Sequence, residues 1–172
     1  MGNISFENFA NLGKNFLSLA SGRSSWMKSK LKFIVKDISL KLILSKSDDV
    51  LDVGCGDARI LNQIKPLVKS VTGIDHHLII NKLKKKYKKI KFISGDIKKD
   101  HSKINKKFNK ILLYSVIHYF NDKKEVLKII KILLSKLNSS GMLLIGDVPN
   151  KNMKQRFKKT NEYKKINDQW IK

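Results

Sequence analysis

The chain has 172 residues, of which 41% are hydrophobic, and this is enough for one domain whose core needs no disulfide or metal. Cys55 is the only cysteine, which excludes a disulfide framework and a cysteine-based zinc site and favours a reducing compartment such as the cytoplasm. The start lacks a secretory signal, and the longest apolar stretch, residues 111–120, is about half of a membrane span. We therefore expect a cytoplasmic protein without a membrane span.

The net charge of +23 raises the question of a nucleic-acid partner, because 37 basic residues stand against 14 acidic ones. Almost all the basic residues are lysine, and arginine occurs only at positions 23, 59 and 156. Proteins that bind nucleic acids make frequent use of the bidentate arginine side chain. A solvated face explains the densest lysine run, residues 82–89, more simply, so a nucleic-acid partner is possible but not favoured.

Residues 1–45 predict two helices that belong to the same domain and cover its ligand pocket as a lid. Apolar residues recur at helical spacing within the first twenty residues and again from Trp26 to Leu44. At the other end, residues 151–172 predict a helical tail with Met153, Phe157 and Trp170 roughly on one face.

Residues 46–150 form the predicted core, in which short apolar runs alternate with polar, helix-like stretches. Strands are expected at 50–53, 70–74, 91–93, 110–114 and 142–145, and helices at 58–64, 78–87 and 125–137, with a poorly patterned stretch near 98–107. The last helix is expected to bury Val126, Leu127, Ile130, Leu133, Leu134 and Leu137 on one face. This alternation predicts a doubly wound, Rossmann-like α/β fold around a parallel sheet.

A glycine-rich turn follows the first predicted strand, where residues 50–61 read VLDVGCGDARIL. Gly54 permits a tight turn, and Gly56 lets a ligand lie against bare backbone in front of a helix N-terminus. A phosphate-binding P-loop would need Gly-Lys-Ser/Thr, and a dinucleotide site would need a small residue where Arg59 stands. Asp52 suits the ammonium group of S-adenosylmethionine better than a phosphate. A plain strand–helix turn is the alternative for this segment.

This turn resembles motif I of the class I S-adenosylmethionine-dependent methyltransferases, with Ala58 in place of the third glycine. Residues 71–75, VTGID, are similar to motif II, whose acid binds the ribose hydroxyls; Asp75 follows Gly54 by 21 positions (75 − 54). Residues 93–97, ISGDI, are similar to motif III, in which Asp96 receives the adenine amino group and Ile97 flanks the ring.

Two further motifs of the family follow in order, in residues 112–120 and in the turn LNSSGMLLI at 137–145. The resemblance implies a sheet of order 3-2-1-4-5 and S-adenosylmethionine as cofactor. The implied cofactor-binding residues are Asp52, Gly54, Cys55, Gly56, Asp75, His76, Asp96, Ile97 and Ser115. The family's strand 6–7 hairpin has no counterpart after Val148, which suggests a C-terminal truncation or a tail helix that covers the sheet edge.

Some of these residues have a structural alternative. Asp75 and Asp96 could each be a helix N-cap, although their shared place at strand carboxyl ends favours a ligand. Cys55 is expected to be a small buried residue rather than a nucleophile, because nothing nearby in the sequence would activate it.

The fourth motif, YSVIHY, bears on the methyl acceptor. It is not the Asn/Asp-Pro-Pro-Tyr/Phe run of the enzymes that methylate DNA amino groups, and it is similar to a run of small-molecule and sugar methyltransferases. The segment GDVPN at 146–150 is similar to family members of bacterial surface-glycan or secondary metabolism. His118 is the candidate general base, with shaping of the pocket as its alternative role.

The sequence thus predicts O-methylation of a small-molecule or glycan acceptor, without a metal. The first alternative is an RNA methyltransferase, which requires the lysines of 82–91 and 151–165 to share one face with the pocket mouth. The second is a non-catalytic S-adenosylmethionine-binding remnant. The oligomeric state is left open.

Overall fold

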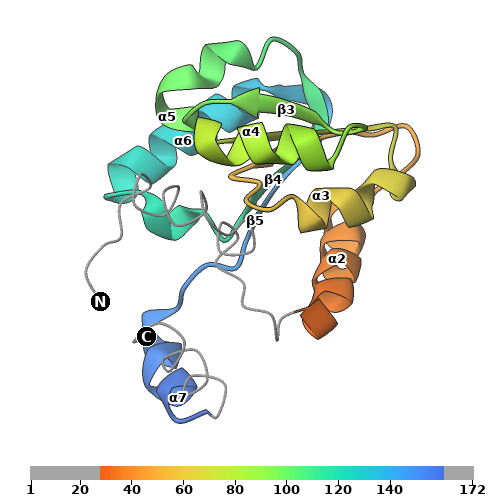
Figure 1. Ribbon diagram of the computed structural model, residues 1–172. Helices are drawn as coiled ribbons and strands as arrows, with labels where there is room; N and C mark the ends of the chain where they lie inside the picture. Colours follow the sequence, from red (N-terminus) through yellow and green to blue (C-terminus); the bar gives the residue numbers. More distant parts are fainter. Residues whose placement is uncertain (1–27, 161–172) are drawn as a thin grey trace.

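The computed structural model describes residues 28–160, and a five-stranded parallel sheet forms its centre (Figure 1). The strands are β1 Asp49–Val53, β2 Ser70–Asp75, β3 Lys91–Ser94, β4 Phe108–Tyr114 and β5 Leu137–Gly146. Their order is β3-β2-β1-β4-β5, and every neighbouring pair is parallel. The predicted doubly wound fold and strand order are confirmed.

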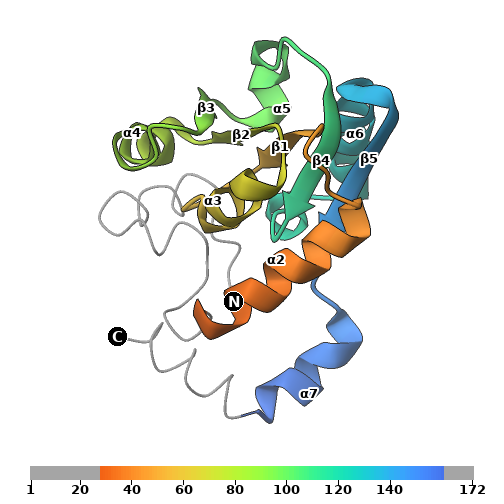
Figure 2. The same cartoon turned by 90° about the vertical axis from the view of Figure 1, so that its right-hand side faces the viewer.

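Helices cover both faces of the sheet (Figure 2). The helices are α2 Lys28–Leu42, α3 Arg59–Ile64, α4 His77–Lys86, α5 Ile97–Asp100, α6 Lys123–Ser135 and α7 Lys154–Lys158, and short 3₁₀ turns lie at Lys65–Leu67, His101–Lys103, Ile117–Tyr119 and Lys151–Met153. Successive residues of a strand point to opposite faces, so Val50 packs with α2, α3 and α4, whereas Leu51 packs with α5 and α6. Both side chains are fully buried, as expected for a parallel sheet covered on both sides.

The predicted strand and helix boundaries agree with the structure to within about two residues, except at β5. This strand begins at Leu137 instead of Met142, because the segment expected as a turn is part of the strand. Phe108 pairs with Leu137 and Lys110 pairs with Met142, so residues 138–141 form a bulge opposite a single residue of β4.

The predicted buried face of α6 is wrong in three positions. Leu127 and Leu134 are 49% and 52% exposed, whereas Ile129 and Leu133 are buried, and Leu137 lies in β5. The helix packs over β4 and β5 at one side of the sheet, where only a narrow stripe of its surface meets the core. A sequence pattern that is apolar over most of the helix surface does not indicate which stripe is covered.

The predicted terminal helices are described in part. The second N-terminal helix is α2, while the first lies outside the described residues, and the lid role stays a prediction. From the predicted tail the structure describes α7, and residues 161–172 lie outside it. Up to residue 160 no strand follows β5, which is therefore an edge of the sheet as described. Among the helices of residues 28–160, none has the length and apolar character needed to cross a membrane.

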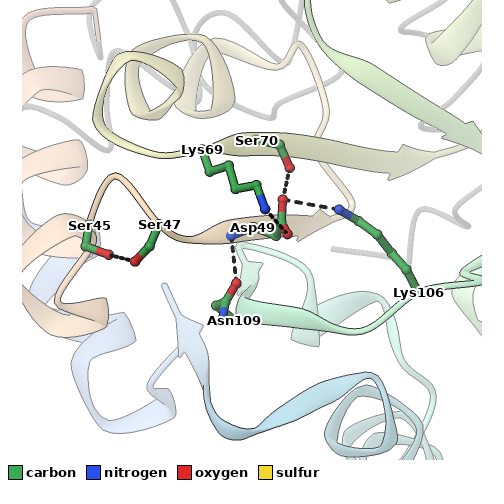
Figure 3. A network of polar contacts seen from close by, with 7 residues as sticks. All are labelled: Ser45, Ser47, Asp49, Lys69, Ser70, Lys106 and Asn109. Atoms are coloured by element: carbon green, nitrogen blue, oxygen red, sulfur yellow. Dashed lines mark hydrogen bonds and ion pairs between the residues drawn. The ribbon is translucent and has the colours of Figure 1, made fainter.

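A polar network fixes the amino-terminal edge of the sheet (Figure 3). The Asp49 carboxylate accepts a hydrogen bond from the Ser70 hydroxyl and lies 3.2 Å from the ammonium group of Lys106. The Asp49 N–H donates to the Asn109 side-chain oxygen at 2.9 Å. The starts of β1, β2 and β4 are therefore joined through one residue. The Ser70 hydrogen bond and then Lys106 lower the pKa of Asp49 against the opposing effect of burial.

Replacing Asp49 with alanine is expected to lower the free energy of unfolding by about 1–2 kcal/mol near neutral pH, because a hydroxyl and an ammonium group lose their acceptor. Because the pKa of Asp49 is lower in the folded chain than in the unfolded one, its contribution to stability is fully present at pH values above the usual pKa of aspartate. The contribution is lost as the pH falls through the folded-state pKa. Urea unfolding at several pH values measures both effects. Asp37→Ala, which removes an exposed acid paired with Lys41, is the control and should change stability little.

Candidate functional site

The turn after β1 takes a backbone conformation that favours glycine. Gly54 and Gly56 have φ values of 75° and 55°, in the left-handed region. A Cβ atom added to Gly54 would lie 2.5 Å from a methyl carbon of Val116, so the space above this turn depends on the absence of a side chain. Ala58, which replaces the third glycine of the motif, also has a positive φ, 58°, and caps the start of α3. The replacement is tolerated at a cost of about 1 kcal/mol in backbone strain.

Asp75 ends β2 and holds the glycine turn in place. One carboxylate oxygen accepts the Gly56 N–H and the other accepts the His76 N–H, each at 2.7 Å. Burial raises the pKa of Asp75 to about 6, although both hydrogen bonds act in the opposite direction. The N-cap of α4 is His76, whose Nδ1 accepts the Leu78 N–H, so the N-cap alternative for Asp75 is wrong.

Asp96, by contrast, is a helix N-cap. One of its oxygens accepts the Lys98 N–H at 2.9 Å at the start of α5. The cap uses one oxygen of the carboxylate, and because an aspartate has about four lone-pair sites, a ligand can still donate to it.

These residues lie around a shallow cleft that is open to solvent. The cleft is lined by Val53, Gly54, Ile74, Asp75, Gly95, Asp96, Ile97, Lys98, Val116, Tyr119 and Phe120. It therefore lies at the carboxyl ends of β1 to β4, where the strand order reverses between β1 and β4. Open α/β sheets bind their ligands at this point.

Four predicted cofactor residues line the cleft: Gly54, Asp75, Asp96 and Ile97. Gly56 and His76 contact Asp75 from outside the lining, and Asp52 is buried within β1. The Cys55 thiol is buried beside Gly73, and burial raises its pKa well above the usual value, as does the nearby Asp75 carboxylate. The structure thus agrees with a packing role for Cys55 rather than with a nucleophile.

Sequence reasoning missed the wall formed by Val116, Tyr119 and Phe120. These residues follow β4 within the fourth motif, of which the sequence predicts only Ser115 and His118 as site residues. Their apolar character in a loop after a strand was the available signal, because exposed loops are usually polar.

The cleft lining also includes Lys98, which bridges two helices. Its ammonium group lies 3.5 Å from the Glu125 carboxylate of α6. Glu125 in turn accepts the Asn121 N–H, while the N-cap residue Asp122 accepts the Glu125 N–H, so side chains satisfy two backbone donors at the start of α6. The loop that carries the apolar wall is therefore held at the beginning of α6.

The ends of β4 and β5 form a second rim next to this wall. Ser115 and Asp147 both have left-handed backbones, with φ values of 59° and 54°, and the Ser115 hydroxyl donates to the Asp147 carboxylate. Non-glycine residues in this conformation cost about 1–3 kcal/mol each and occur often at functional sites. His118 follows in the Ile117–Tyr119 turn, with part of its ring exposed to solvent. Partial desolvation lowers the pKa of His118, and the Asp147 carboxylate opposes that shift.

Residues 44–171 match the family model of a methyltransferase domain, which covers well over half of the chain. The chain belongs to this methyltransferase family. No curated protein matches it in sequence.

Solved structures with bound S-adenosylmethionine or S-adenosylhomocysteine share the fold. The N-methyltransferase NodS from Bradyrhizobium japonicum WM9, in complex with S-adenosyl-L-homocysteine, superposes with a TM-score of 0.63 at 18% identity, over 81% of this chain and 69% of NodS. The DhpI–S-adenosylhomocysteine complex has a TM-score of 0.63 at 12% identity, over 84% and 70%. CalS10, an amino pentose methyltransferase from Micromonospora echinaspora with bound S-adenosylmethionine, has a TM-score of 0.57 at 16% identity, over 73% and 52%.

Proposed function

We propose that this methyltransferase uses S-adenosylmethionine to methylate a hydroxyl group of a small-molecule or glycan acceptor. The observation that carries the proposal is the cleft at the switch point, where the bare backbone of Gly54 and the carboxylate of Asp75 meet. This pairing suits a nucleoside ligand whose ribose hydroxyls donate hydrogen bonds.

The donor and acceptor groups of the cleft fit S-adenosylmethionine better than a dinucleotide. Asp75 and Asp96 offer carboxylate oxygens to the ribose hydroxyls and the adenine amino group, and Ile97 with Phe120 offers apolar contact to the ring. Lys98 is the one basic residue among the lining residues that the structure describes, and it pairs with Glu125, so a pyrophosphate would lack partners. NodS and DhpI hold S-adenosylhomocysteine, which supports the same assignment. Asp52, Cys55, Gly56, His76 and Ser115 stay predicted members of this site.

Binding of the acceptor at the remaining part of the sheet edge is supported by the positions of the proposed cofactor residues. Most of the proposed cofactor residues lie at the ends of β1, β2 and β3, whereas Ser115 and Phe120 follow β4. The acceptor is therefore proposed to bind next to them at the ends of β4 and β5, where His118 lies. When bound beside Gly54 and Asp75, S-adenosylmethionine would supply a sulfonium-activated methyl group for the acceptor oxygen and would leave as S-adenosylhomocysteine. His118, neutral at pH 7 because its pKa is lowered, accepts the hydroxyl proton and passes it to solvent through its exposed edge.

The small size of the acceptor is supported by CalS10, which acts on an amino pentose. The arrangement of lysines does not favour the RNA alternative. Residues 82–91 run from the end of α4 into the start of β3, at the amino-terminal edge of the sheet, whereas residues 151–160 follow the carboxyl end of β5. The first lysine run thus lies at the edge of the sheet opposite the cleft, so a face shared by both runs at the pocket mouth lacks support.

Replacing His118 with alanine is expected to lower kcat by about 10²–10⁴-fold, the usual contribution of a general base, with an unchanged Kd for S-adenosylhomocysteine. Wild-type kcat should fall as the pH drops below the lowered pKa of His118, because the protonated ring cannot accept the proton. Methyl transfer to an acceptor panel measures the rate, and calorimetry measures the Kd. An unchanged rate in the variant would remove His118 from the mechanism, and a folded wild type that binds no S-adenosylhomocysteine would overturn the proposed function.

A further inference from the structure

Asp147 is an acidic residue at the acceptor side of the cleft that the proposed chemistry leaves without a role. Asp147 directly follows β5, and its carboxylate accepts a hydrogen bond from the hydroxyl group of Ser115, the residue that directly follows β4. Ser115 also donates its backbone N–H to the Gly146 carbonyl at 3.1 Å. Two hydrogen bonds thus join the ends of β4 and β5, and the exposed Asp147 carboxylate lies there.

This carboxylate lies on the same rim as the proposed base. Its charge acts on the His118 ring, and Val116, the next residue after Ser115, lies over Gly54 in the cleft. A group bound to Asp147 would therefore be near both His118 and the end of the cleft where the glycine turn lies.

Asp147 is one of three exposed acidic residues within residues 28–160, together with Asp37 and Asp122. Asp37 forms an ion pair with Lys41, and the Asp122 carboxylate caps α6 by accepting the Glu125 N–H. Among the side chains that the structure describes, no lysine or arginine lies within 4.0 Å of Asp147, whose hydrogen-bond partner is the uncharged Ser115 hydroxyl.

We infer that the acceptor carries a protonated amino group that binds Asp147, next to the hydroxyl group that approaches His118. This inference rests on the proposed function and narrows its acceptor to hydroxyl-bearing amines such as amino sugars and amino alcohols. The Ser115 hydroxyl occupies one lone pair of the carboxylate, and the others can accept charge-assisted N–H bonds from an ammonium group. An anionic acceptor would be repelled at this position, and a neutral acceptor would gain less from the carboxylate.

The test compares matched acceptors on the wild type, on Asp147→Asn and on the control Asp37→Asn. D-glucosamine is compared with N-acetyl-D-glucosamine and D-glucose, and 2-amino-1-phenylethanol is compared with its N-acetyl derivative. Asparagine keeps the size of the side chain, can still accept the Ser115 hydroxyl, and tolerates a positive φ, so the variant should fold normally. Asp37 carries the same charge on the exposed surface of α2 and lies outside the site.

The free amines should be preferred over their acetylated forms in kcat/KM, and Asp147→Asn should lower kcat/KM for the amines alone by about 10–100-fold, the usual effect of losing a charged hydrogen-bond partner. Ligand-observed NMR with S-adenosylhomocysteine present should show the same Asp147-dependent preference in binding, and mass spectrometry should place the methyl group on oxygen. Equal use of free and acetylated amines, an equal loss for all acceptors in Asp147→Asn, or methylation at nitrogen would overturn the inference. If no acceptor is methylated but the free amines bind selectively and in an Asp147-dependent way, the proposed reaction is refuted and the amine site is retained. If there is neither methylation nor selective amine binding, the inference is overturned.

Discussion

A Gly54→Val variant is expected to bind S-adenosylhomocysteine at least about 100-fold more weakly than the wild type, or not at all. The valine Cβ would lie 2.5 Å from the Val116 side chain, so that one of the two must move into the cleft. The backbone at φ 75° adds strain, since β-branched residues rarely adopt the left-handed region. Calorimetric titration gives the affinity, and urea unfolding gives the accompanying loss of stability, which we expect to be about 2–4 kcal/mol.

Two controls separate the loss of the ligand space from a general loss of stability. Gly141→Val adds a side chain at the crowded bulge of β5, where the nearest atoms belong to Leu137, Asn138 and Asn109, so it should destabilise the chain without changing the Kd. In a Gly54→Ala/Val116→Ala double variant the collision is removed and the backbone strain remains, so part of the affinity should return. A folded Gly54→Val protein with wild-type affinity would mean that the ligand does not lie over this turn.

The sheet and the first half of the site could be predicted because their signals are local. In residues 50–61 the strand, the glycines and the helix follow one another directly, and the acids at positions 75 and 96 stand at the ends of the next two strands. Because parallel strands have their carboxyl ends at the same edge of the sheet, motifs that follow successive strands come together at that edge. The cleft lined by Gly54, Asp75 and Asp96 agrees with that reasoning.

The acceptor side could not be predicted in the same way, because its contacts join distant residues. Ser115 and Asp147 are 32 positions apart, and their hydrogen bond depends on the register between β4 and β5. That register is displaced by the bulge at residues 138–141, which the sequence suggests only as a turn. The positive φ of Asp147 has no local sequence signal either, since aspartate is common in every kind of turn.

Asp75→Asn is expected to weaken S-adenosylhomocysteine binding by about 100-fold near pH 7.5, because a charged acceptor of the ribose hydroxyls becomes a neutral one. The wild-type affinity should also depend on pH. The pKa of Asp75 is raised to about 6 by burial, so the carboxyl group is ionised near pH 7.5 and increasingly protonated below 6. Affinity should therefore fall by up to about tenfold per pH unit below that value, whereas the asparagine variant should show no such dependence.

The same titration has an opposite effect on the stability of the ligand-free chain. A raised folded-state pKa means that the Asp75 contribution to folding is greatest below the unfolded value of ~3.9 and is lost as the pH rises through about 6. The ionised Asp75 carboxylate, which is proposed to bind the ligand, thus destabilises the ligand-free chain. Ligand binding near pH 6 should therefore release a proton from Asp75. Calorimetry in buffers of different ionisation enthalpy measures that proton. An equal release by Asp75→Asn would assign the titration to another group, with the neighbouring His76 first among those to test.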